Sequence, residues 1–380
     1  MAETVMIVTG ETSGELYGAL LAVSLKKRLP HLHLIGIGGE RMKEAGVELI
    51  SGIAGAFGIA EAISSINAIR ETFRKATGAL ERHKPDVLVL IDYPDFNLKL
   101  AREAKKHNIK VFYYVSPQVW AWRKGRVKKL AALVDKMAVV LPFEEEIYRN
   151  SGLDCEFVGH PVFDEIQDIG NDKREIRKEL GMEEDRPLIS LLPGSRPHEL
   201  DRLLPVLLET AREFSQSFRN FQLCVPLAPN TDIQQYSHII DKLKQEGVVI
   251  NKGESLKVLA ASDLAVIASG TASLQAALLG APMVVIYKLF PLTFWIGKLI
   301  VRIRHISLVN ILSGREVVKE LLQSDVTHQN INDELREILL NKEYKENMLK
   351  AYDNIREMFS GKRASERVAE MVAEMAGSEK

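Results

Sequence analysis

The chain has 380 residues, 46% of them hydrophobic, which is enough for two domains of ordinary size with separate cores. Its 50 basic and 51 acidic side chains give a formal net charge of -1, which argues against nucleic acid as a partner. The two cysteines, Cys155 and Cys224, match no metal-ligand spacing and indicate buried thiols in a reducing cytoplasm.

The N-terminal residues show no targeting pattern. No basic segment precedes an apolar one there, so no signal peptide is predicted. No apolar stretch reaches the ~18–20 uncharged residues that a membrane-spanning helix needs. We therefore expect a cytoplasmic protein.

The first half of the chain alternates short apolar segments with amphipathic ones. The predicted strands are Val5–Thr9, His33–Gly36, Val87–Ile91, Val111–Val115, Lys136–Val140 and Cys155–Val158. Amphipathic segments lie between them, among others at Glu15–Leu29, Ala60–His83 and Leu98–His107. This alternation predicts a parallel sheet with helices on both faces.

A polar passage at residues 164–186, with one predicted helix at Lys173–Leu180, separates the two halves. The alternation then restarts, with predicted strands at Leu188–Leu192, Gln222–Val225, Gly247–Ile250, Leu264–Ala268 and Met283–Tyr287. We therefore predict an α/β protein of two doubly wound, Rossmann-like domains that face a central cleft, residues 1–163 and 164–342. The helical segment at about 343–380 is expected to cross back to the first domain.

Several motifs place polar residues where apolar strands end. Residues 91–97 read IDYPDFN, with Asp92 at the carboxyl end of a strand, and residues 113–126 read YYVSPQVWAWRKGR. Open parallel sheets bind their ligands at such ends. The other motifs are GETSGE (10–15), FVGH (157–160), LPGSR (192–196), ASGTA (268–272), PLTFW (291–295) and NILSGR (310–315).

In this order, over residues 5–323, the motifs closely resemble those of lipid-A-disaccharide synthases, a family of bacterial glycosyltransferases. The resemblance implies the GT-B fold and a reaction in lipid A biosynthesis. UDP-2,3-diacylglucosamine and 2,3-diacylglucosamine 1-phosphate (lipid X) would give a β-1,6-linked tetraacyl disaccharide 1-phosphate and UDP. Because the donor is α-linked, the anomeric carbon would invert in one displacement that needs a single base. No cofactor is implied.

Asp92 is the expected base, because a sugar hydroxyl attacks poorly unless its proton is removed. The family's proposed catalytic aspartate matches it by position. Asp95 is either a turn residue beside a proline or an acceptor contact. Glu11 lies in the loop that lines the family's catalytic cleft and is the second catalytic candidate. Thr12 or Ser13 is expected to cap the following helix.

Residues of the second half are expected to hold UDP. A glycine, a hydroxyl and a guanidinium at 194–196 suit a diphosphate, although an ordinary helix-capping loop has the same pattern. The helix start at 270–273 offers free amides. The expected UDP contacts are Gly194, Ser195, Arg196, Gly270, Thr271, Ala272, Ser273, Gln275, Asn310 and Arg315. The family usually has Glu at the position of Gln275, so a charged acceptor for the ribose is lost.

The chain contains no D-x-D pair, so we predict no metal at the diphosphate. Arg196 and helix amides would have to stabilise its charge instead.

Basic and apolar segments are the candidates for contact with the lipid. Residues 120–130 carry five basic groups and no acid. Residues 289–303 present an apolar face with basic residues beside it, which is typical of membrane-surface helices, although most such stripes belong to a core. The expected acceptor or lipid contacts are Ser13, Asp95, Trp122, Arg123, Arg126, His160, Trp295, Lys298 and Arg302. We therefore expect the protein on the inner face of the inner membrane, and leave a homodimer open.

Two other functions stay compatible with the sequence. A second GT-B activity, such as a UDP-N-acetylglucosamine epimerase, would need several acid–base groups around the sugar and no lipid-facing surface. The 289–303 segment argues against it. A non-catalytic, membrane-associated nucleotide-sugar binder would fit Gln275, and turnover separates it from an enzyme.

Overall fold

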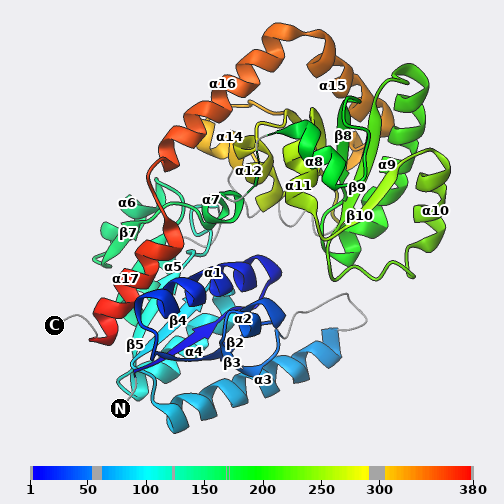
Figure 1. Cartoon of the computed structure of the whole chain (residues 1–380). Helices are drawn as coiled ribbons and strands as arrows, with labels where there is room; N and C mark the ends of the chain where they lie inside the picture. Colours follow the sequence, from blue (N-terminus) through cyan, green and yellow to red (C-terminus); the bar gives the residue numbers. More distant parts are fainter. Residues whose placement is uncertain are drawn as a thin grey trace. The chain divides into compact units, whose positions relative to one another are not determined.

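The computed structural model describes residues 3–53, 62–121, 125–167, 169–170, 172–290 and 304–377. The chain divides into two compact units (Figure 1). The first comprises residues 1–164 and 361–380, and the second comprises residues 165–360. Each unit is built on one parallel sheet.

The first unit has a seven-stranded sheet in the order β3-β2-β1-β4-β5-β6-β7. Its strands are β1 (Thr4–Val8), β2 (His33–Ile37), β3 (Glu48–Ser51), β4 (Val87–Ile91), β5 (Lys110–Tyr114), β6 (Lys136–Val139) and β7 (Cys155–Phe157). Strands run outwards in one direction from β1 and in the other from β4. The switch point, where such sheets bind ligands, therefore lies between β1 and β4.

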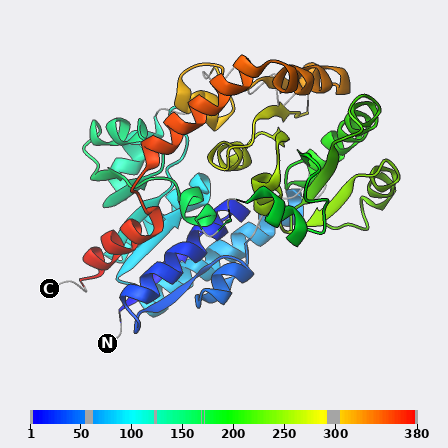
Figure 2. The same cartoon turned by 45° about the horizontal axis from the view of Figure 1, so that its top comes forward.

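Helices cover both faces of this sheet. They are α1 (Thr12–Arg28), α2 (Glu40–Glu44), α3 (Ala62–His83), α4 (Pro94–Lys106), α5 (Arg126–Leu133), α6 (Glu144–Arg149), α7 (Pro161–Ile166), which runs into the second unit, and α17 (Ala364–Ala376). Helix α17 packs along α1, and α3 packs on α4. Both views show the red α17 beside the blue α1 (Figures 1 and 2).

The second unit repeats this plan with six strands in the order β10-β9-β8-β11-β12-β13. The strands are β8 (Leu188–Leu192), β9 (Gln222–Leu227), β10 (Val249–Lys252), β11 (Leu264–Ala268), β12 (Met283–Tyr287) and β13 (Glu320–Leu322). The helices are α8 (Lys173–Glu179), α9 (Pro197–Ser217), α10 (Ser237–Gln245), α11 (Ser255–Ala261), α12 (Thr271–Leu278), α14 (Leu308–Ser313), α15 (His328–Leu340) and α16 (Lys342–Phe359), with a short 3-10 turn at Gln323–Asp325. Its switch point lies between β8 and β11.

All the predicted strands are present, and their ends shift by a few residues at most. Two short strands, β3 and β13, were not predicted, because three or four residues give too little alternation to be recognised. The two cysteines are buried free thiols, as expected, and burial raises the pKa of each to about 12.

The prediction for the C-terminal helices was wrong in part. Helix α16 belongs to the second unit, and only α17 returns to the first. Arg356 on α16 donates from Nε to the carbonyl of Leu278 at 2.9 Å and from Nη2 to that of Ala277 at 3.2 Å. These bonds satisfy carbonyls at the end of α12. An amphipathic pattern shows that a helix buries one face, but it does not show which core covers that face.

None of the helices in the described ranges is both long and apolar enough to cross a bilayer. Most of the predicted membrane-surface segment, residues 291–303 with Trp295, Lys298 and Arg302, lies outside those ranges.

Candidate active site

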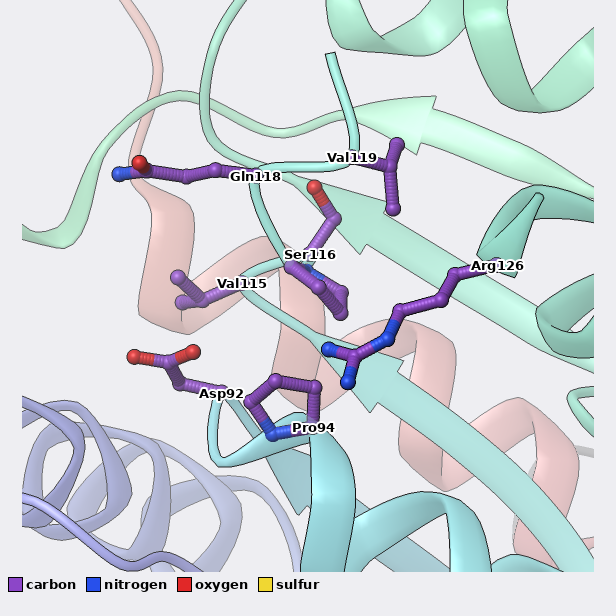
Figure 3. A pocket seen from close by; sticks show the side chains of 8 residues that line it. Asp92, Pro94, Val115, Ser116, Gln118, Val119 and Arg126 are labelled. Atoms are coloured by element: carbon purple, nitrogen blue, oxygen red, sulfur yellow. The ribbon is translucent and has the colours of Figure 1, made fainter. Parts of the chain in front are cut away.

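The carboxyl ends of β4 and β5 open into a pocket of about 230 Å³ in the first unit. Its lining residues are Asp92, Pro94, Val115, Ser116, Pro117, Gln118, Val119 and Arg126. Figure 3 shows the Asp92 carboxylate and the Arg126 guanidinium on either side of the Pro94 ring. The two motifs found in the sequence thus form a single pocket, because β4 and β5 are neighbours.

The backbone at this pocket is strained. Asp92, Tyr93 and Val115 have φ values of 47°, 44° and 62°, in the left-handed region. A residue other than glycine pays roughly 1–2 kcal/mol for this conformation, and a β-branched valine is especially unfavourable there. Such strain persists only where surrounding contacts hold it, and it is typical of functional sites.

Asp95 and Arg126 form an ion pair between Oδ1 and Nη2. The Arg126 side chain is 10% exposed, whereas that of Asp95 is 74% exposed. The pairing joins the first turn of α4 to the first residue of α5. Both are predicted acceptor contacts, and here the carboxylate orients the guanidinium that lines the pocket. The neighbouring candidates Trp122 and Arg123 lie outside the described residues.

A buried carboxylate that the sequence analysis missed supports the pocket wall. Glu144 is 1% exposed and accepts hydrogen bonds from Ser116 Oγ at 2.8 Å, Trp120 Nε1 at 3.0 Å and the Leu141 amide at 3.2 Å. Burial outweighs these bonds and raises the pKa of Glu144 to about 7. The turn at 116–120 is thereby fixed from behind.

Glu11 lies across the switch point from Asp92, at the end of β1. A Cβ on Gly10 would lie 2.3 Å from the Tyr93 ring, so only glycine lets the β1 and β4 loops approach this closely. Burial, reinforced by the charge of Glu11, raises the pKa of Tyr93. The two catalytic candidates therefore both border Tyr93.

The predicted helix cap in this loop was wrong. Glu11, not Thr12 or Ser13, is the N-cap residue of α1, and no side chain caps that helix. The helix begins at Thr12 itself, so both hydroxyl residues fall inside its first turn, past the capping position. Ser13 lies in the first turn of α1, and its expected contact with the acceptor stays a prediction.

His160 is buried, and its ring packs edge-on against that of Tyr17 at 5.9 Å. The Val162 amide donates to Nδ1 at 3.2 Å, and burial lowers the pKa of the imidazole to about 3. A neutral ring held inside the protein is a packed core residue and not the acceptor contact that the sequence analysis expected. We therefore do not include His160 among the proposed acceptor contacts.

The predicted UDP loops leave two adjacent strands of the second unit. Leu192 of β8 pairs with Ile267 of β11, so residues 194–196 and 270–273 emerge at the same edge, at the switch point. A Cβ on Gly194, whose φ is 94°, would lie 2.1 Å from Glu199 Oε2. Glycine is therefore required at this position.

Glu199 already uses two amides of this loop. Its Oε2 accepts from the amides of Ser195 at 3.0 Å and Arg196 at 3.2 Å. The Arg196 side chain is 50% exposed, with Nη1 3.6 Å from Glu199 Oε1. For binding an anion the loop therefore offers the exposed guanidinium of Arg196 and the hydroxyl of Ser195, not those two amides.

At the start of α12, Gly270 is exposed and Thr271 and Ala272 are partly exposed. Ser273 is buried, and its hydroxyl donates to the Gly270 carbonyl at 2.9 Å, so this side chain closes the turn and does not face a ligand. Gln275 donates from Nε2 to Oε2 of Glu165 at 2.7 Å. A carboxylate thus lies beside the glutamine after all, supplied by another segment.

The structure gives Asn310 a different role from the one predicted. It is fully buried, and its amide group makes four hydrogen bonds within the protein. Oδ1 accepts from the amides of Val317 and Val318, and Nδ2 donates to the Val318 carbonyl and to Glu320. The side chain holds the loop between α14 and β13, which leaves it no group for UDP. Arg315 in that loop is exposed.

Two doubly wound parallel sheets, each with its polar loops at a switch point, make this a two-domain α/β protein of the GT-B fold class. The sequence model described as "Lipid-A-disaccharide synthetase" matches residues 5–375. A lipid-A-disaccharide synthase from Syntrophus aciditrophicus is 42% identical over 372 residues, 97% of each chain. One from Geobacter sulfurreducens is 41% identical over 381 residues, 99% of this chain and 98% of the relative. The chain belongs to the lipid-A-disaccharide synthase family, and is therefore a glycosyltransferase of lipid A biosynthesis.

Solved structures agree on the fold. A UDP-GlcNAc 2-epimerase from Neisseria meningitidis bound to UDP-GlcNAc matches with a TM-score of 0.69 at 13% identity, over 98% of this chain and 100% of that one. A glycosyltransferase from Rickettsia africae matches with a TM-score of 0.56 at 13% identity, over 98% of both chains. At such identities the likeness concerns the fold alone. It is therefore no evidence that this chain is an epimerase, the alternative function considered in the sequence analysis.

Proposed function

We propose that this enzyme transfers the diacylglucosamine unit of UDP-2,3-diacylglucosamine to the 6-hydroxyl of 2,3-diacylglucosamine 1-phosphate. The product is the β-1,6-linked tetraacyl disaccharide 1-phosphate, and UDP leaves. The anomeric carbon inverts in a single in-line displacement, so no covalent intermediate on the enzyme is needed.

The observation that carries this proposal is the position of Asp92. Its carboxylate borders the pocket at the carboxyl ends of β4 and β5, and the backbone that carries it is strained. In that place it accepts the proton of the acceptor hydroxyl as the glycosidic bond forms. Glu11, across the switch point, is the second acidic group of the proposed site, and Ser13 borders it. Arg126, oriented by Asp95, supplies positive charge for the acceptor phosphate.

The second unit is proposed to hold the donor. Arg196 and Ser195 contact the diphosphate, together with Gly194 and the exposed start of α12 at 270–272. A guanidinium stabilises charge that grows as UDP departs. Gln275 with Glu165 offers an amide and a carboxylate to the ribose hydroxyls, and Arg315 is a further candidate contact.

We also propose that the enzyme works at the inner face of the inner membrane. Both substrates carry acyl chains, and residues 289–303 combine apolar and basic side chains. Trp295, Lys298 and Arg302 are the proposed contacts with lipid, and Trp122 and Arg123 those nearer the acceptor. A homodimer is compatible with this arrangement but is not required by it.

The test is UDP release from UDP-2,3-diacylglucosamine in detergent and EDTA, with and without 2,3-diacylglucosamine 1-phosphate. We expect release only when the acceptor is present, together with a disaccharide 1-phosphate detected by mass spectrometry. Release without acceptor would indicate hydrolysis. Donor binding without release would support the non-catalytic alternative.

A further inference from the structure

Two buried side chains converge on the backbone of Asp92 from behind the pocket. The Tyr113 hydroxyl donates to the Asp92 carbonyl at 2.5 Å. The Asn97 amide donates from Nδ2 to the same carbonyl at 2.7 Å and to the Ile91 carbonyl at 3.2 Å. One carbonyl oxygen, at the residue proposed as the base, thus accepts from two side chains.

These donors come from elements that flank the strand end. Tyr113 lies on β5, next to β4, and Asn97 lies in the first turn of α4. Both side chains are 0% exposed. Neither can touch a substrate in the pocket, so any influence on the reaction must pass through Asp92.

The conformation of Asp92 explains why it needs such support. Asp92 and Tyr93 take left-handed conformations in succession, which no glycine relieves. In that geometry the Asp92 carbonyl lies past Ile91, the last ladder residue of β4, and a partly buried carbonyl without partners would cost up to about 1–3 kcal/mol. The two hydrogen bonds remove this cost and fix the peptide plane, which in turn sets the direction of the carboxylate.

We propose that Tyr113 and Asn97 are positioning residues that hold the strained backbone of Asp92 and so aim its carboxylate at the acceptor hydroxyl. This inference rests on the proposed function of Asp92 as base. It assigns to Asn97 and Tyr113 a part in turnover, in addition to their part in the core.

The experiment is a double-mutant cycle on the full chain in detergent, with both lipid substrates. Tyr113→Phe removes only the hydroxyl and keeps the ring. We expect kcat to fall about tenfold with KM for both substrates within about twofold, because small misplacements of a catalytic group act on the chemical step. In an Asp92→Asn background the same change should alter kcat by less than about twofold, since there is no base left to aim.

Tyr114→Phe is the matched control. Tyr114 is the next residue on β5 and equally buried, but strand alternation places it on the opposite face of the sheet. It should keep wild-type kcat at a thermal midpoint similar to that of Tyr113→Phe. Asn97→Ala tests the second donor. We expect the same loss of kcat as in Tyr113→Phe, and a change in kcat of less than about twofold in the Asp92→Asn background.

Each contrary outcome has one meaning. Wild-type kcat in both Tyr113→Phe and Asn97→Ala overturns the positioning role. A loss of equal size in the wild-type and Asp92→Asn backgrounds also overturns it, because the effect would not pass through Asp92. Near-wild-type turnover of Asp92→Asn alone would instead remove the proposed base, and the inference with it.

Discussion

Gln275 and Glu165 lie 110 residues apart in the sequence, yet Nε2 of the glutamine donates to Oε2 of the glutamate at 2.7 Å. The contact joins α12 to the C-terminal end of α7, within the second unit. At this position the resemblance to the family implies a glutamate, and here the carboxylate beside Gln275 is that of Glu165.

Gln275→Glu should therefore destabilise this enzyme, although the resemblance to the family implies a glutamate at this position. It replaces a hydrogen bond by two facing carboxylates, which we expect to destabilise the fold by about 1–2 kcal/mol at pH 8 and by less at pH 5, where a shared proton relieves the repulsion. Thermal unfolding at the two pH values measures this. The exchange Glu165→Gln with Gln275→Glu should restore stability, and equal stability of the single variant at both pH values would argue against the contact.

The buried carboxyl of Glu144 predicts a pH dependence of stability. Its pKa rises from an ordinary 4.5 to about 7 on folding. Below 4.5 both folded and unfolded chains hold the proton; between 4.5 and 7 only the folded chain does. Folding is therefore less favourable as pH rises through this window, by up to about 3 kcal/mol, and is unaffected beyond it.

Glu144→Gln removes this titration. The stability of the wild type relative to this variant should fall between pH 4.5 and 7, measured as urea midpoints by tryptophan fluorescence, to which Trp120 contributes. A difference that is constant across this range would show that Glu144 titrates normally.

Asn310→Ala should act on stability and not on donor binding. It leaves the buried amides of Val317 and Val318 without their acceptor, which we expect to cost about 2–4 kcal/mol. The fraction that remains folded should bind UDP-sugar with unchanged KM. Arg315→Ala, in the same loop but exposed, should do the opposite, with a raised KM at a normal thermal midpoint. A raised KM for UDP-sugar in folded Asn310→Ala would instead show that Asn310 contributes to donor binding.

Arg196 is expected to act mainly on the transition state. Arg196→Ala should lower kcat by about 10²-fold, and Arg196→Lys should recover little, because an ammonium lacks the planar fork. The thermal midpoint should hardly move, since the side chain is half exposed. Arg202→Ala on the same helix serves as the control and should keep wild-type turnover. Full activity of Arg196→Ala would exclude a role in leaving-group stabilisation.

Much of the fold could be read from the sequence because buried parallel strands are continuous apolar runs. Val87–Ile91 and Leu264–Ala268 are fully buried strands, and both stand out without any alignment. The place of Asp92 followed from the strand that precedes it, since ligands gather at carboxyl ends.

What could not be read are contacts between distant segments. Glu144 looks like any acid in an acidic run, and only the fold brings it under Ser116 and Trp120. Asn310 was read as a ligand contact because a motif cannot show that all four of its hydrogen-bonding positions are used inside the protein. Tyr113 and Asn97 both lie within motifs found in the sequence. Their shared hydrogen-bond acceptor is a backbone carbonyl, which every residue has, so residue types could not predict it.

The proposed mechanism depends on Asp92, which removes the proton from the acceptor hydroxyl. The most direct measurement is the rate of acceptor-dependent disaccharide formation by Asp92→Asn, with circular dichroism and donor binding to establish that the variant is folded. We predict a loss of at least about 10²-fold in kcat with donor affinity unchanged. A folded Asp92→Asn enzyme that turns over at nearly the wild-type rate would exclude Asp92 as the base.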